Sequence, residues 1–190
     1  MSIKQIKSTG TELTSVRVKQ IKVLIKTIAA NTSIHPQRVP SSQGDNKIVF
    51  CVTDSSRITD INQFNSGSEI NERFKTINPA FTASYYEIWN KVANTKQDYH
   101  LYRIYFHIYS SESDKEYILL HTDPLDNDLT HGIYKRSPHL HIKHSNDNII
   151  PHAHFALNIN DYDIALSTLD EINKCFKNHI EMLSHQILKH

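Results

Sequence analysis

Two short segments carry four histidines in one repeated frame. The segments are SPHLHI at residues 137–142 and IPHAHF at residues 150–155, so that Pro-His-x-His occurs twice within about one hairpin's length of chain. Imidazole titrates near neutral pH, and its neutral form is a common metal ligand. The repeat therefore predicts proton-transfer chemistry or metal binding at His139, His141, His152 and His154.

The alternation within each segment predicts a pair of neighbouring strands. Successive side chains of a strand point to opposite faces, so His139 and His141 should share one face while Leu140 takes the other. If the two segments form a hairpin, we expect His141 near His152 and His139 near His154. This patch should point away from the packed face. The alternative is a solvated strand face that uses histidine only for its polarity.

One chemical hypothesis is a metal site. Zinc or iron binds several imidazoles at once, and His121, Asp123 or His107 could add a ligand to the repeated histidines. The sequence has no helical metal signature, and Asp123 is the one obvious carboxylate that could orient a ligand. We therefore expect no cofactor, with a divalent metal such as zinc as the alternative. In that alternative the ligands come from His121, His139, His141, His152 and His154.

The other hypothesis is metal-free acid–base catalysis on RNA. One imidazole would take the proton of a 2′-hydroxyl while another protonates the leaving oxygen. A cation would offset the negative charge of the transition state, and Arg136 lies directly before the first histidine pair. The catalytic residues on this hypothesis are Arg136, His139, His141, His152 and His154.

Basic residues gather near the start of the chain. Residues 1–40 hold seven lysines and arginines against the single acid Glu12, although the net charge of the whole chain is +1. This distribution predicts contact with an anionic partner, and its alternative is a solvated amphipathic helix. The residues that we expect to bind nucleic acid are Lys19, Lys22, Lys26, Arg103 and Lys135.

The composition predicts a cytoplasmic protein that does not contact a membrane. No stretch approaches the roughly 18 apolar residues that a membrane span needs. The first residues are polar and basic, without the apolar middle of a secretory signal. The two cysteines lack metal-ligand spacing, which favours a reducing compartment.

The elements that must position the histidines follow an α+β order. Helical spacing predicts helices over residues 11–30, 66–77, 79–94 and 161–188. Strands are predicted over residues 47–53, 99–109, 116–122 and the two histidine segments, and a connecting loop over residues 35–46. The predicted fold is an antiparallel sheet of about four to five strands packed by N-terminal helices and a long C-terminal helix. We expect a single domain, 1–190, whose residues 1–95 are mostly helical and whose residues 96–190 carry the hairpins and the last helix.

Part of the sequence resembles a known toxin family. The segments YKRSPHLHI and IPHAHF, followed by a closing helix, are similar to the C-terminal half of TumE-like toxins of bacterial toxin–antitoxin modules. The resemblance covers at most residues 99–190, and it departs from the family pattern at Ser137 and at Leu140, which separates histidines expected to be adjacent. It implies a nuclease-like toxin that acts on RNA and is restrained by a partner protein. The matching positions are Arg136, His139, His152 and His154.

Three functions fit these observations. The first is a histidine-dependent nuclease or phosphodiesterase of the ribonuclease type, in a bacterial toxin or defence system with an antitoxin-like partner. The second is a non-catalytic subunit of a multiprotein assembly, and the third is a metal-dependent hydrolase. The first two differ in whether the histidines converge in a cleft beside Arg136 or lie spread over an interface.

Overall fold

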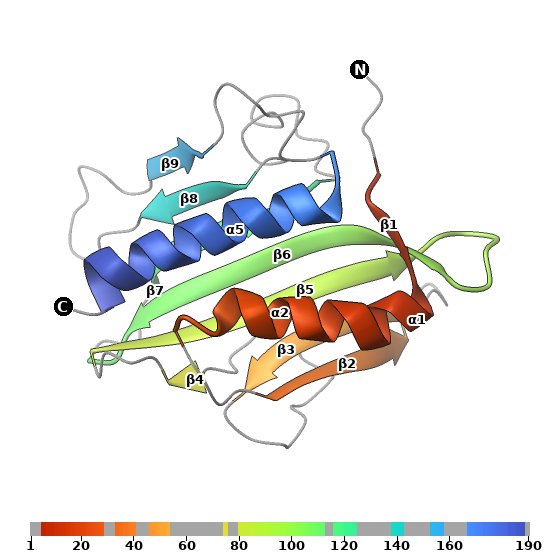
Figure 1. Cartoon of the computed structure of the whole chain (residues 1–190), viewed down its shortest axis with the longest axis horizontal. Coiled ribbons are helices and arrows are strands. Elements are labelled where there is room, and N and C mark those ends of the chain that lie inside the picture. The colour runs from red at the N-terminus through yellow and green to blue at the C-terminus, as the bar shows by residue number, and fades with distance from the viewer. Residues whose placement is uncertain are drawn as a thin grey trace.

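Two helical segments cover one face of a long antiparallel sheet (Figure 1). The structure is a computed structural model of the chain. It describes residues 5–28, 33–40, 46–53, 74–75, 80–112, 116–124, 138–142, 153–157 and 167–188. The predicted α+β class is confirmed, with an N-terminal helix and a long C-terminal helix packed against the sheet.

Neighbouring strands of the sheet run antiparallel throughout its described part. The strands are β1 (Lys7–Thr9), β2 (Ser33–Pro40), β3 (Asn46–Thr53), β4 (Phe74–Lys75), β5 (Phe81–Lys91), β6 (Asp98–Ser110), β7 (Glu116–Thr122), β8 (His139–Ile142) and β9 (Ala153–Ala156). Their order is β2-β3-β5-β6-β7-β8-β9, with β1 paired to β6 and β4 paired to β5. Strands β3, β6 and β7 confirm the sequence prediction, and the two histidine segments form β8 and β9.

The helix predicted over residues 79–94 is wrong, because this segment forms strand β5. Its apolar residues recur at nearly helical intervals, which suggested the helix. Residues 83–87 are all buried, however, because both faces of β5 are covered, and a strand buried on both faces loses the apolar–polar alternation. The many aromatic side chains of this segment fit a strand.

The loop predicted over residues 35–46 is also wrong in its first part, which belongs to β2. This strand pairs with β3 from Ser33 opposite Thr53 to Pro40 opposite Asn46. It stands at one end of the described strand order, where proline is tolerated because an edge strand has backbone groups outside the ladder. The helix predicted over residues 66–77 is described only at Phe74–Lys75, which form strand β4. Its other residues lie outside the described part of the chain.

The first helix confirms the helix predicted near the N-terminus. It runs through α1 (Gly10–Glu12), a π-helical segment, η1 (Leu13–Arg17), and α2 (Val18–Ile25). Thr9 caps its start, and the Glu12 carboxylate accepts a hydrogen bond from the Thr9 backbone at 2.9 Å. This backbone bond, with the hydroxyl groups of Ser8 and Thr9, lowers the pKa of Glu12.

The C-terminal helix begins later than the sequence indicated. It consists of α5 (Leu169–Leu183) and a π-helical turn, η3 (Ser184–Leu188). Thr168 has extended backbone angles, and its hydroxyl accepts a hydrogen bond from the Glu171 backbone, so it is the N-cap. A helix start near residue 161 is therefore wrong.

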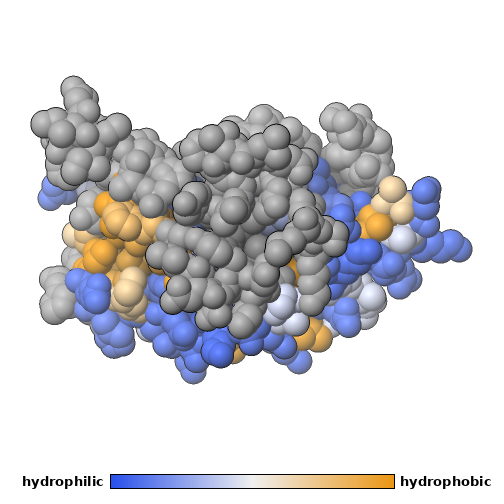
Figure 2. Space-filling model, turned by 90° about the horizontal axis from the view of Figure 1, so that it is seen from above, coloured by the Kyte–Doolittle hydropathy of each residue, from blue (hydrophilic) through white to orange (hydrophobic). Residues whose placement is uncertain are grey.

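The hydrophobic core lies between the two helical segments and the sheet. Ile21 and Leu24 of α2 and Phe176 of α5 belong to one buried cluster with Phe106 of β6 and Leu140 of β8. Seen from above, most described residues on the helix side of the molecule are hydrophilic (Figure 2). Among the described helices, none combines the length and the apolar character that a bilayer span needs.

A buried ion pair joins the first helix to the sheet. Arg17 and Glu87 are 2% and 0% exposed, and Arg17 Nη2 lies 2.6 Å from Glu87 Oε2. The Tyr85 hydroxyl and the Trp89 indole N–H donate to the same carboxylate, and Arg17 also donates to Asn173 of α5. Burial alone would lower the pKa of Arg17, but Glu87 outweighs it and keeps this pKa raised. The pair therefore connects the first helix, β5 and α5.

Candidate functional site

Three histidines gather on the sheet face opposite the helices. Leu120 of β7 and Leu140 of β8 point into the core beneath the helices. Because side chains alternate along a strand, His121, His139 and His141 point to the other face. We call these three residues the histidine cluster.

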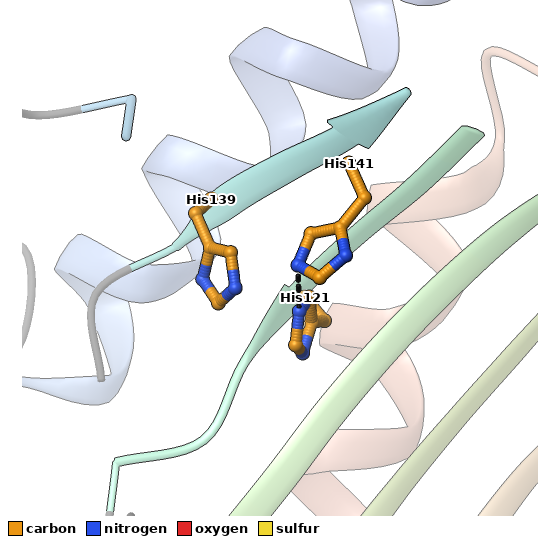
Figure 3. Close-up of side chains that lie close together, drawn as sticks. All are labelled: His121, His139 and His141. Carbon is orange, nitrogen blue, oxygen red and sulfur yellow. Dashed lines mark hydrogen bonds between the residues drawn. The ribbon is translucent and has the colours of Figure 1, made fainter. Parts of the chain in front are cut away.

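The register of β7 and β8 brings the cluster together. His121 lies directly opposite His139, and Leu119 lies opposite His141. Side chains directly opposite on neighbouring strands have Cβ atoms about 5 Å apart, and diagonal neighbours are still within reach of a ring. The three rings accordingly turn toward one another from two strands (Figure 3).

The ring nitrogens of the cluster are close enough to share one ion. One nitrogen from each histidine can be chosen so that all three lie within 4.8 Å of one another. The shortest separation is 2.6 Å, between the Nε2 atoms of His121 and His141. Two nitrogens bound to one zinc at about 2.0–2.1 Å would lie roughly 3.3 Å apart. The contact between His121 and His141 is shorter than this value, so binding of a zinc ion requires these two rings to turn apart.

The cluster is buried, which overturns the solvated-face alternative for its two motif residues. His139 is 0% exposed and His141 is 7% exposed, and His121 is also buried. A polar group in the interior is costly unless it is hydrogen-bonded or bound to a metal. The histidines of β8 therefore do more than make a strand face polar.

Asp123 contacts Nδ1 of His121, the ring nitrogen opposite the Nε2 atom that faces His141. Its Oδ2 atom is 3.0 Å from His121 Nδ1, a close contact whose angle departs from that of a linear hydrogen bond. A carboxylate at Nδ1 favours a proton on that nitrogen and leaves the Nε2 lone pair for a ligand. A carboxylate behind a metal-bound histidine is a common arrangement in zinc proteins.

Two further side chains hold Asp123. The Tyr105 hydroxyl donates to it at 3.1 Å from Oδ2, and Arg103 Nε lies 3.6 Å from Oδ1. Burial, and then the negative charge of Asp123, raises the pKa of Tyr105 well above its usual range, so the phenol stays protonated and keeps donating. The Tyr105 ring also meets His121 edge-on, with ring centroids 4.6 Å apart.

His107, a candidate ligand from the sequence, lies outside the histidine cluster. Its ring stacks between Tyr86 and Tyr109, with centroids 5.7 and 5.6 Å away. It occupies the register position opposite Leu119 on β7, on the same sheet face. His107 therefore belongs to the aromatic surroundings of the site.

The predicted pairing of the two histidine segments is confirmed, but its register differs. Strands β8 and β9 are antiparallel neighbours, with His141 opposite His154 and His139 opposite Ala156. The sequence predicts His141 near His152 and His139 near His154. The difference is two residues, and the alternation of a strand repeats every two residues, so the sequence pattern fits both registers equally.

Several predicted site residues are not brought to the cluster. Lys19, Lys22 and Lys26 are exposed on the N-terminal helix, across the sheet from the histidines. Lys135, Arg136 and His152 lie outside the described residues, and His154 is described only by its backbone position. Of the predicted cations, Arg103 lies next to the site.

Comparison of the chain with protein-family models, with curated proteins and with solved structures finds no match. The functional argument therefore depends on the site itself. Sequence reasoning named His121 and Asp123 as candidates but missed the link from Asp123 to Tyr105. The register of the β6–β7 hairpin, which sets Tyr105 opposite His121, was the signal that could have found it.

Proposed function

We propose that the protein binds one divalent transition metal, such as zinc, through His121, His139 and His141 and is a metal-dependent hydrolase. The observation that supports this most is the convergence of three imidazoles with Asp123 behind one of them. Three histidines leave one position of a tetrahedral ion open, as in catalytic rather than closed structural zinc sites. A metal bound there would supply a water molecule acidified to near neutral pH.

The protein's own residues fix the proposed ligands. Asp123 orients the His121 ring and favours its Nε2 lone pair, and the Tyr105 hydroxyl donates a hydrogen bond to Asp123 in turn. The β7–β8 register holds His139 opposite His121. Ligands fixed in this way pay little conformational entropy on binding, which favours affinity.

Burial favours a metal over direct contact with an RNA strand. Histidines that take a proton from a ribose hydroxyl must reach the RNA, whereas His139 is fully buried. Ring nitrogens that bind a metal touch only the ion, and the open position of the ion then meets the substrate in their place. The buried cluster therefore supports the metal-dependent hydrolase above the metal-free nuclease.

A metal-free ribonuclease is the second candidate, and one contact favours it. At 2.6 Å, the Nε2 atoms of His121 and His141 share a proton if no ion separates them. Such a contact places one imidazole as hydrogen-bond donor and the other as acceptor, the two roles that acid–base catalysis requires. The similarity to TumE-like toxins, the RNA substrate and the antitoxin-like partner belong to this candidate and stay predictions.

Zinc titration of the purified, chelator-treated protein tests the proposal. We expect the wild type to bind one zinc per chain and His139→Ala to lose this binding. His185→Ala is the matched control, because His185 is an exposed histidine of η3 on the helix side. Equal zinc binding by all three proteins, or none by the wild type, would contradict the proposal.

A further inference from the structure

Arg103 stands at the most exposed end of a row of side chains that leads to the histidine cluster. It lies on the same face of β6 as Tyr105, which is opposite His121. The exposed fraction of the side chain rises along the row, from 7% at His121 to 16% at Asp123 and 27% at Arg103. Of these three side chains, Arg103 is therefore the one most accessible to solvent.

Two aromatic rings among the described residues lie against the guanidinium of Arg103. Its central carbon lies 4.4 Å from the centroid of Tyr102 and 5.4 Å from that of Tyr105. Cation–π contacts of this kind fix the plane of the group while its N–H donors remain at the edge. Burial alone would lower the pKa of Arg103, but Tyr105 and Asp123 outweigh it and keep the pKa raised.

Asp123 engages this cation only loosely. The shortest distance is 3.6 Å, longer than a hydrogen bond between charged groups, and Arg103 Nε makes no hydrogen bond with any described residue. An arginine whose only purpose was to neutralise Asp123 would gain more from a close, two-point contact. The observed geometry leaves donors of the guanidinium for another anion.

We infer that Arg103 binds the anionic group of the substrate, a phosphate or a phosphate ester, at the entrance to the metal site. The inference rests on the proposed metal-dependent function and adds the substrate class. The planar guanidinium can donate hydrogen bonds to two oxygens of a phosphate. Arg103 lies beside Asp123, which in turn contacts His121 of the histidine cluster. A phosphate held there would place a neighbouring ester bond toward the metal.

Phosphate binding to the zinc-loaded protein tests the inference. We expect Arg103→Met to weaken binding of inorganic phosphate by roughly 10- to 100-fold, the range for losing a hydrogen bond to a charged group. Arg103→Lys should weaken it less, because the charge stays while the two-point contact is lost. Lys96→Met is the control, because it removes the same charge from an exposed turn and should leave phosphate affinity unchanged.

Titration of a second ligand shows whether the bound phosphate group comes from inorganic phosphate or from RNA. A short RNA oligonucleotide is titrated beside inorganic phosphate, and weakening of either by Arg103→Met supports the inference and identifies the source. Unchanged affinity for both ligands, with one zinc still bound, would overturn it. If Arg103→Met does not fold, Arg103→Lys carries the same comparison.

Failure of the proposed metal-dependent function can be recognised separately from failure of the anion site at Arg103. If the wild type binds no zinc, that function is wrong, and the phosphate titrations are repeated on the metal-free protein. Loss of phosphate binding in Arg103→Met would then still support an anion site at Arg103. Absence of phosphate binding by the metal-free wild type would overturn that site as well.

Discussion

The Nε2 atoms of His121 and His141 face each other at 2.6 Å inside the protein, although the residues are 20 positions apart in the sequence. Two neutral nitrogens at this distance cannot both present lone pairs, so either a proton joins them or the two rings turn apart to about 3.3 Å around a bound metal ion. Asp123 beside His121 Nδ1 favours the tautomer that leaves Nε2 unprotonated. The third imidazole, from His139, makes an ion the better match, because one proton joins only two nitrogens.

Asp123→Asn should weaken zinc binding without abolishing it. The three ligands remain, but the carboxylate that orients the His121 ring is lost. Replacement of such an outer carboxylate lowers metal affinity by roughly 10- to 100-fold. Competition with a chelator measures the affinity, and Asp170→Asn, at an exposed acid of α5, is the control. Equal zinc affinity of the two variants would show that Asp123 does not support the metal site.

Chelation should abolish hydrolysis if the metal is catalytic. We expect activity on phosphodiester substrates, RNA among them, to disappear with chelator and to return with zinc. The competing account, a metal-free ribonuclease, predicts that RNA turnover persists in chelator. It also predicts that His139→Ala, His154→Ala and Arg136→Ala each lower this rate, the histidine variants by roughly 10²- to 10⁴-fold. Persistent turnover with these losses would replace the metal-dependent mechanism by the acid–base one.

Much of the fold followed from local patterns. The aromatic and β-branched residues of 99–109 and 116–122 predicted β6 and β7, and helical spacing predicted the first and last helices. β5 was missed because residues 83–87 are buried on both faces and show no alternation. Burial on both faces is a property of the whole sheet, which a local pattern does not contain.

The residue types of the site were predictable from the sequence, but which of these residues contact one another was not. The repeated frame singled out His139 and His141, but it did not show that His121 of β7 lies opposite His139. A register shift of two residues leaves every side chain on the same face, so periodicity does not select among such registers. The burial of the cluster is likewise set by the tertiary structure.

The Arg17–Glu87 pair predicts a large stability effect away from the site. Glu87→Gln leaves the buried Arg17 without its counter-charge and should lower the free energy of unfolding by about 3–5 kcal/mol. Combining it with Arg17→Met should cost less than the sum of the single changes, because the stranded charge is removed. Denaturant unfolding measures these values. Lys177→Met, which breaks an exposed pair with Glu181, should change stability by less than about 0.5 kcal/mol. Similar losses from Glu87→Gln and Lys177→Met would contradict this assignment.

Buried phenols predict a loss of stability in alkali. Burial raises the pKa of Tyr85, Tyr86 and Tyr105 above the ordinary value, so the folded protein resists their ionisation. Their contribution to stability is complete below about pH 10, the unfolded pKa, and is lost as pH rises from there toward the folded pKa values. Phenolate absorbance of these tyrosines should therefore rise together with unfolding. Full ionisation of all nine tyrosines near pH 10 while the protein stays folded would rule this out.

X-ray absorption at the zinc edge tests the central claim most directly. The account predicts that protein loaded with one equivalent of zinc shows three imidazole ligands at about 2.0–2.1 Å and one further light-atom ligand. His121→Ala, His139→Ala and His141→Ala should each lose this spectrum, whereas His185→Ala should keep it. A zinc spectrum with fewer than three imidazoles, or one unchanged by the cluster variants, would contradict the metal site.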